Sequence, residues 1–223
     1  MDEYSRMIVG WQWADADTVW NNMCVLRGIY ERYGLPKMLY TDNASMFKTI
    51  RHGESSHQRH RMHGYETELQ RAMRELEVTM FSHGPYQPQS KGKIERFFRF
   101  MQGRFISRHD ERTIDGLNAS FGRWVDWYNR CHVNRTTEQV PKDRHTPSVW
   151  RPVSCESLNR TLCFKDTRKA DKCNTFKFEG AAYTIPDSQC LAHMTLSLEY
   201  TPDSIRAYDR HDRFIHQFDR ITK

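Results

Sequence analysis

This 223-residue sequence predicts an α/β domain that is followed by a helical segment and a small β-barrel. Its first half alternates short β-branched and aromatic runs with a long helical repeat, which is the pattern of a strand–helix–strand unit. Its last part contains short alternating runs at regular spacing, separated by turn signals, as in small barrels. The length suits one large domain, or one domain with a small module.

The composition favours a nucleic-acid partner. The 34 lysines and arginines exceed the 28 acidic residues and give a formal charge of +6, and the isoelectric point is near 9.0. Mean hydropathy is low at −0.84, but 12 Phe, 10 Tyr and 6 Trp supply apolar groups for a core. No window has the apolar length of a membrane span, and the start MDEYSR lacks a signal peptide's apolar core. The six cysteines form no CxxC pair, so we expect free thiols in a cytoplasmic protein without a membrane anchor.

The first strand is expected at Met7–Ala14, and Asp15 or Asp17 can cap the helix that follows. One face of this helix is apolar, and Gly34 with Pro36 ends it; the face consists of Val19, Met23, Leu26, Tyr30 and Tyr33. A short strand, Met38–Thr41, then places Asp42 at its carboxyl end. A strand–helix–strand unit predicts parallel pairing with a right-handed crossover. Functional side chains gather at the carboxyl ends of such strands, so Asp42 is a candidate.

The stretch 48–65 is polar and contains four histidines, His52, His57, His60 and His63. They could form a metal site, but no Cys or acid completes a ligand set, and a basic surface insertion is favoured. Thr67 and Gln70 form a capping-box pattern for a helix that buries Leu69, Met73 and Leu76. Val78–Phe81 is the last strand expected in this domain.

A loop with Pro85 and Pro88 leads into a second helix, whose apolar face comprises Ile94, Phe97, Phe98, Met101 and Phe105. Glu95 lies off that face, among the cations Lys91, Lys93, Arg96, Arg99, Arg104 and Arg108. Glu95 could pair with Lys91 or Arg99, four residues away on either side. Alternatively, it is a metal ligand at a site that binds a phosphate backbone. The second carboxylate, Asp42, favours the metal-ligand interpretation.

Three motifs resemble the catalytic core of DDE transposases and retroviral integrases, which has a ribonuclease H-like fold. They are DEYSR at 2–6, YGLPKMLYTDNASMF at 33–47 and PYQPQSKGKIERF at 85–97. They stand in the family's order, cover about the first half of the chain, and are most similar to bacterial insertion-sequence transposases. The resemblance makes Asp42 the second and Glu95 the third acid of the catalytic triad. It implies two Mg²⁺ (or Mn²⁺) ions for DNA strand cleavage and transfer.

Two departures from the family pattern matter. Ala44 stands where the family has a glycine, which permits positive φ. Asp2 matches the acidic position of a turn and not the first catalytic Asp, whose strand is absent from this sequence. We therefore expect an N-terminally truncated core that is inactive alone and less stable than an intact one. The alternative function is a catalytically inactive DNA-binding remnant or regulator, and the fold alone also allows a ribonuclease H-type nuclease.

The rest of the chain extends the resemblance. A helix is expected at Thr113–Tyr128, where Trp124 and Trp127 are assigned to core packing rather than base stacking. The predicted organisation is a core at 1–110, a post-core helix at 111–133, a linker at 134–159 and a β-barrel at 160–223. The expected partners are DNA and further copies of the chain in a homo-oligomer. The expected DNA-binding residues are Lys91, Lys93, Arg96, Arg99, Tyr86 and Gln87.

Overall fold

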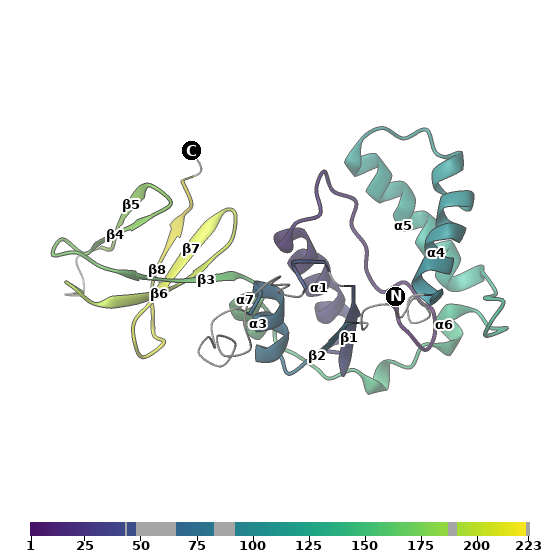
Figure 1. The fold of residues 1–223 in the computed structure, drawn as a ribbon, viewed down its shortest axis with the longest axis horizontal. Coiled ribbons are helices and arrows are strands. Elements are labelled where there is room, and N and C mark those ends of the chain that lie inside the picture. Colours follow the sequence, from purple (N-terminus) through teal and green to yellow (C-terminus); the bar gives the residue numbers. More distant parts are fainter. Residues whose placement is uncertain (43, 48–65, 83–91, 187–190, 222–223) are drawn as a thin grey trace, which may run out of the picture. The chain divides into compact units, whose positions relative to one another are not determined.

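The computed structural model describes residues 1–42, 44–47, 66–82, 92–186 and 191–221 (Figure 1). The chain forms two compact units, Met1–Leu158 (unit 1) and Asn159–Lys223 (unit 2). Unit 1 mixes helices with a small parallel sheet, and unit 2 is built mainly of antiparallel strands. In the described ranges, no helix is both long and apolar enough to cross a membrane.

Helix α1, Val19–Tyr33, begins and ends by local signals. Thr18 caps it by accepting a hydrogen bond from the Asn21 amide, so the cap is Thr18 and not the predicted Asp15 or Asp17. Gly34 ends the helix at a φ of 90°, where a side chain would meet the Arg151 carbonyl. The predicted apolar face is confirmed at its centre, where Met23, Leu26 and Tyr30 are buried.

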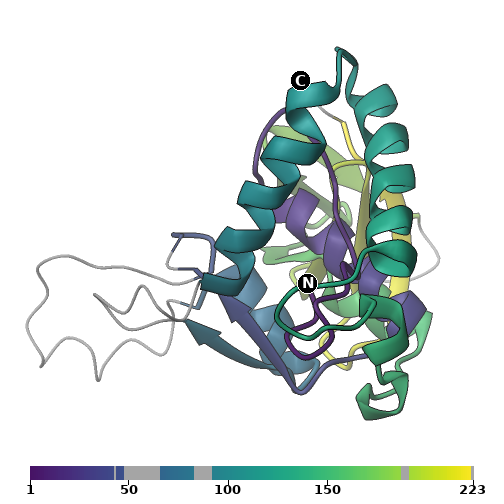
Figure 2. The ribbon, with the colours of Figure 1, turned by 90° about the vertical axis from the view of Figure 1, so that its right-hand side faces the viewer.

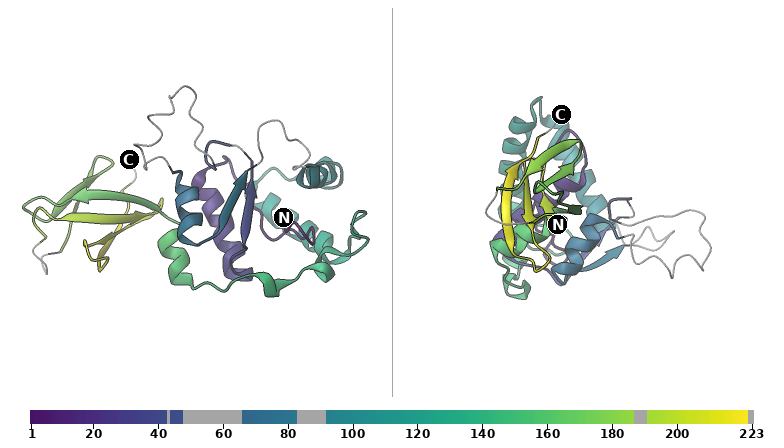
Figure 3. Two further views of the ribbon diagram at one scale, coloured as in Figure 1. Left: turned by 60° about the horizontal axis from the view of Figure 1, so that its bottom comes forward. Right: turned by 90° about the vertical axis from the view of Figure 1, so that its left-hand side faces the viewer.

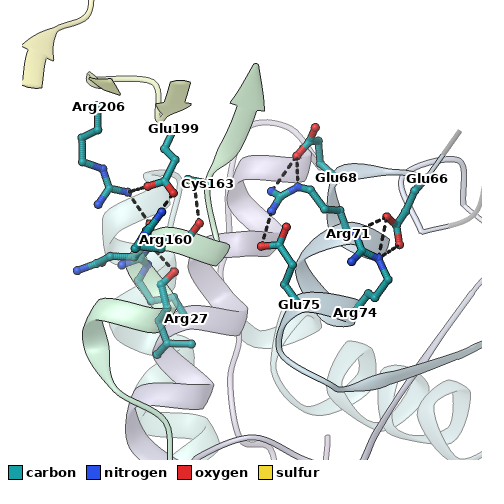
Figure 4. Close-up of polar contacts among 12 residues, drawn as sticks. Arg27, Glu66, Glu68, Arg71, Arg74, Glu75, Arg160, Cys163, Glu199 and Arg206 are labelled. Atoms are coloured by element: carbon teal, nitrogen blue, oxygen red, sulfur yellow. Dashed lines mark hydrogen bonds and ion pairs between the residues drawn. The ribbon is translucent and has the colours of Figure 1, made fainter. Parts of the chain in front are cut away.

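The sheet of unit 1 has two described strands, β1 (Met38–Thr41) and β2 (Thr79–Ser82). They are parallel, Thr41 lies opposite Ser82, and both carboxyl ends therefore point the same way (Figure 3). Helix α3, Glu68–Glu75, connects back to β2 and begins with the predicted capping box. Figure 4 shows Arg71 of this helix between Glu68 and Glu75.

The prediction of a first strand at Met7–Ala14 was wrong, and so was its parallel pairing with Met38–Thr41. These residues form no strand, and β1 pairs with β2 instead. Two asparagines on α5 (Ile114–Cys131) replace the missing ladder. Asn129 accepts from the Ile8 amide and donates to the Ile8 carbonyl, both at 2.9 Å. Asn118 makes the same pair of bonds with Trp13, again at 2.9 Å.

We call these four hydrogen bonds of Asn118 and Asn129 the asparagine clamp. They can form together because the spacing of the two asparagines along the helix matches that of their partners along the extended segment. Asn118 and Asn129 are eleven residues apart, close to three helical turns, so they share one face and are separated by about 16 Å. Ile8 and Trp13 are five residues apart, and an extended chain covers about the same distance. On its other side the segment touches α1, since a Cβ on Gly10 would lie 2.4 Å from Ile29 Cγ1.

Helices α4 (Gly92–Arg104) and α5 form a hairpin, connected through the 3₁₀ turn η2 at Ile106–Arg108 (Figure 2). Aromatic rings fill the space between them: Phe121 lies 5.0 Å from Phe105 and stacks on Trp124 at 5.5 Å. Phe97, Met101 and Phe105 are buried as predicted. Phe98 is 48% exposed, so its assignment to the buried face was wrong, and Trp127 at 44% is likewise not a core residue.

Residues 133–158 remain part of unit 1 and carry short helices, α6 (Pro141–Arg144), η3 (Pro147–Val149) and the start of α7 (Cys155–Thr161). Leu35 and Arg151 exchange backbone hydrogen bonds of 2.7 and 2.9 Å, which fasten this stretch beside the end of α1. The stretch treated as a linker thus contains ordered elements.

The described residues of unit 2 contain six strands in two sheets. Strands β3 (Phe164–Lys169), β6 (Thr195–Tyr200), β7 (Ser204–Tyr208) and β8 (Phe214–Asp219) form an antiparallel sheet in that order, and β4 (Thr175–Phe178) pairs with β5 (Ala181–Thr184). Their inner side chains share one apolar core, in which Phe176, Leu196 and Ile205 are fully buried. The strands predicted from alternating apolar residues are confirmed. Among the described residues, however, the sheets do not close into the predicted barrel.

A buried acid holds the start of unit 2 to its sheet. Glu199 of β6 is 4% exposed, and its oxygens lie 3.2 Å from both Arg160 and Arg206 (Figure 4). Arg160 also pairs with Asp212 at 2.5 Å. Two positive partners compensate the desolvation of the buried carboxylate, which would be costly alone.

The asparagine clamp gives a first prediction. Asn129→Ala removes both bonds to Ile8 and should lower the free energy of unfolding of unit 1 by about 1–3 kcal/mol. Urea unfolding followed by tryptophan fluorescence reports on unit 1 alone, because all six tryptophans lie between residues 11 and 150. Arg123→Ala, an exposed change on the same helix, should stay within about 0.5 kcal/mol of the parent. Equal stability of the two variants would mean that the clamp contributes nothing.

Two turns of unit 2 give a second prediction. Asp171 accepts from the Thr175 and Cys173 amides, and Asp209 accepts from the Arg213 and His211 amides. These bonds hold the pKa of both carboxyls below the ordinary 3.8, led by the bonds from Thr175 and Arg213. A depressed folded-state pKa adds stability above the ordinary value, and this stability is lost as the pH falls through the folded value.

Unit 2 should therefore become easier to unfold in urea below about pH 4. The double variant Asp171→Asn, Asp209→Asn should lose much of this acid dependence, as measured by the NMR signals of unit 2 methyl groups. Asp203→Asn, an exposed turn residue, is the matched control. If the double variant and the control depend on acid to the same extent, Asp171 and Asp209 are not the source of the acid sensitivity of unit 2.

Candidate functional site

Asp42 directly follows β1, as predicted. It is exposed, and its Oδ1 accepts a hydrogen bond of 3.0 Å from the Ala44 amide. The Ala44 carbonyl then accepts from the Phe47 amide at 2.9 Å, so the chain turns tightly after the strand. Ala44 is not among the residues with positive φ. The departure from glycine at this position is therefore accommodated without backbone strain.

Glu95 lies in the first turn of α4 and is also exposed. A carboxylate is stabilised at this end of a helix by the unpaired amides and the helix dipole. In the part of the chain that the structure describes, Glu95 and Arg99 form no ion pair. The interpretation of Glu95 as a pairing partner of Arg99 is thus not supported, and its carboxylate faces solvent.

Asp42 follows β1 at the edge of the sheet where the paired strand β2 also ends. β2 ends at Ser82, opposite Thr41, and α4 begins at Gly92. The chain therefore leaves the sheet at the edge beside which Asp42 stands, before it enters the helix that carries Glu95. Lys91, Tyr86 and Gln87, predicted to bind DNA, lie outside the described residues.

The predicted DNA-binding cations of α4 divide between two sides of the helix. At about 100° per residue, Arg99 lies on the Glu95 side, whereas Lys93 and Arg96 turn away from it. Arg99 is exposed. Lys93 forms an ion pair with Glu3, and Arg96 donates to the Thr136 hydroxyl at 3.0 Å.

Sequence reasoning missed a pocket of about 640 Å³ on that second side of α4. Its walls come from the N-terminal turn, α4, and the end of α5 with the following loop. Arg6, Arg104, Tyr128 and His132 contribute to it, in addition to Lys93 and Arg96. Only the basic character of α4 was visible beforehand, because the other walls are distant in sequence.

The two acids are suitable ligands for a hard cation. Mg²⁺ is typically held by one or two carboxylates together with water and substrate phosphates. No group of three or more His, Cys, Asp or Glu side chains is placed to hold a metal within the described ranges. A magnesium site built on Asp42 and Glu95 would thus depend on oxygen ligands from other sources.

Comparisons with known proteins show what the chain is similar to. Residues 76–135 match the integrase core domain family. A putative transposase for insertion sequence element IS5376 of Geobacillus stearothermophilus is 24% identical over 132 residues, 59% of this chain and 32% of the relative. Putative transposase y4bF of Sinorhizobium fredii is 26% identical over 160 residues, which are 70% of this chain and 32% of that relative. The chain thus spans about a third of the length of these curated relatives.

Among solved structures, one match is a chain in the cryo-EM structure of the simian T-cell lymphotropic virus intasome in complex with PP2A regulatory subunit B56 gamma. It has a TM-score of 0.40 and 16% identity, and covers 83% of this chain and 59% of its own length.

The family match and the curated relatives support a likeness to the catalytic core of DDE transposases and integrases. The matched segment, residues 76–135, includes Glu95, and an insertion-sequence transposase is among the proteins to which the chain is similar.

Proposed function

We propose that this chain supplies two carboxylates, Asp42 and Glu95, to a metal-dependent site for DNA strand cleavage and transfer. The observation that carries the proposal is the position of the acids: one follows a parallel strand, and the other begins the helix entered from that sheet edge. Glu95 also lies inside the segment that matches the integrase core domain. We further propose that unit 1 is part of a ribonuclease H-like core.

Asp42 and Glu95 would hold the Mg²⁺ or Mn²⁺ ions, and both are exposed as the approach of a DNA phosphate requires. When bound, two such ions activate the attacking oxygen and stabilise the leaving oxygen of a phosphodiester. The exposed cations of α4 would neutralise neighbouring phosphates and orient the strand. The short turn after β1 fixes the Asp42 carboxylate through its bond with Ala44.

The partners proposed are the DNA ends of a mobile element, target DNA and further copies of the chain. Unit 2 would assist by contacting DNA or another subunit. Because the chain spans about a third of the length of its curated relatives, the activity of those whole proteins is a proposal for this chain.

The second candidate is a DNA-binding protein without catalytic activity. Its support is that, within the described ranges, no group of three or more His, Cys, Asp or Glu side chains could hold a metal ion. The two candidates differ in metal binding by Asp42 and Glu95, because only the catalytic one needs it.

Metal binding gives a third prediction. Mn²⁺ titrations followed by electron paramagnetic resonance, with duplex DNA present, should show binding that Asp42→Asn or Glu95→Gln weakens at least tenfold. Asp110→Asn, an exposed acid beyond α4, is the control and should leave binding unchanged. If both acid variants bind Mn²⁺ as well as the parent, the catalytic proposal fails and the DNA-binding candidate remains.

The basic helix gives a fourth prediction. Replacing Lys93, Arg96 and Arg99 by alanine should weaken binding to duplexes of any sequence alike. The slope of log affinity against log salt should flatten by about 2–3 units, because each lost phosphate contact contributes about 0.9. A control variant with three exposed cations removed elsewhere in unit 1, Arg123, Arg130 and Lys142, should keep the parental slope. An unchanged slope in the α4 variant would show that these side chains do not contact phosphates.

A further inference from the structure

We infer that the 640 Å³ pocket beside α4 binds one unpaired nucleotide of a DNA strand, with its phosphate on the arginines and its base against an aromatic wall. The DNA origin of the nucleotide rests on the proposed function, whereas the chemistry of the pocket stands on its own residues. The pocket lies on the side of α4 that faces away from Glu95.

The charges at the pocket all have one sign. Five cationic side chains line it, Arg6, Lys93, Arg96, Arg104 and Arg135, and none of its described lining residues is Asp or Glu. Glu3 pairs with two of these five, Lys93 and, at 3.8 Å, Arg6. The first turn of α4 adds its dipole and its unpaired amides at Gly92, which also lines the pocket. A bound anion would thus meet several uncompensated positive groups.

Arg6 shows the need for an anion most directly. Its side chain is only 13% exposed, and its buried Nη1 has no hydrogen-bond partner in the described part of the chain. The same Nη1 forms a long ion pair of 3.8 Å with Glu3. Burial and then the charge of Arg144 lower the pKa of Arg6, and the charge of Asp2 offsets part of this shift. Arg6 also has a φ of 67°, which fixes its direction at the end of the N-terminal turn.

Aromatic rings line the pocket together with these cations. His132 lies 4.6 Å from Phe100 and stacks on Tyr128 at 5.1 Å, as measured between ring centroids. Phe97 meets Tyr128 edge-on at 5.4 Å. Phe100 and His132 are half-buried, so each keeps ring surface in contact with solvent. Such rings stack with any base, because every base has a π-face.

The loop that closes the pocket is held in place. Thr136 accepts from Arg96, and its amide donates to the Asn134 side chain at 2.9 Å. The Asn134 backbone is in turn paired with Gln139. This ordering keeps the loop that carries Arg135 beside α4 before any ligand arrives, which lowers the entropic cost of binding.

The shape of the pocket favours a single nucleotide over a duplex. Its volume is in the range of sites that enclose small molecules, about 300–1,000 Å³. Phosphates of a duplex are contacted from convex or grooved surfaces, and its bases are stacked and cannot reach a wall of rings. An acidic peptide would use the arginines and leave the rings without a partner.

The test uses the full chain, a short fluorescein-labelled oligodeoxythymidylate and a duplex carrying the same strand, both measured by anisotropy without metal. His132→Ala should weaken single-strand binding about tenfold, and Phe100→Leu should do the same, because base stacking on one ring contributes about 1–3 kcal/mol. Duplex binding should change less than about twofold. His132→Phe should retain single-strand binding, and Arg123→Met is the control outside the pocket. Tryptophan fluorescence checks that each variant is folded.

Equal losses for single strand and duplex would overturn the inference and make the pocket part of a general phosphate surface. Unchanged single-strand binding in the folded His132→Ala variant would overturn it as well. Competition separates the ligand classes: thymidine monophosphate should displace the probe, and polyglutamate or inorganic phosphate at the same charge should not. Loss of Mn²⁺ binding in the Asp42 and Glu95 variants tests the proposed function separately, since those variants leave the pocket intact.

Discussion

The position of helix α5 depends on the pairing of two asparagine amides with an extended backbone. Asn118 and Asn129 each offer one donor and one acceptor, which is what a neighbouring strand would offer Trp13 and Ile8. The pairing succeeds because three helical turns and five extended residues cover about the same length. Once α5 is fixed in this way, its rings position α4, and α4 carries both Glu95 and the wall of the pocket.

Most elements of unit 1 could be predicted from local sequence signals, but the hydrogen-bond pairing between those elements could not. The capping residues Thr67 and Gln70 and the terminating Gly34 act within a few residues, so their effects can be read directly from the sequence. The run Met7–Ala14 has the composition of a strand because it is extended and packed on both sides. Amino-acid composition indicates that a segment is extended and buried, but it does not indicate which groups its backbone amides bond to. Here those groups are side chains on a helix. In unit 2, the alternation of apolar and polar residues likewise predicted the strands but not their order in the sheets.

The same division holds at the candidate site. The positions of Asp42 after a strand and of Glu95 at the start of a helix could be predicted, because each residue lies in a recognisable motif. The pocket was not predictable, because its walls come from the start of the chain, α4 and the end of α5. Phe98 illustrates the difficulty: its spacing suited the apolar face, yet the helix turns its neighbours Phe97 and Met101 inward and leaves Phe98 exposed.

Helix α4 thus has three sides with different chemistry. One side packs through Phe97, Met101 and Phe105 and makes the helix rigid. The second carries Glu95 and Arg99, and the third faces the pocket with Arg96 and Phe100. Because a helix with its side chains is about 10–12 Å wide, a strand held by a cation at Glu95 would reach the pocket by crossing only the end of α4. The rigid packed side would keep the two contacts in register, which is what positioning a reactive phosphate requires.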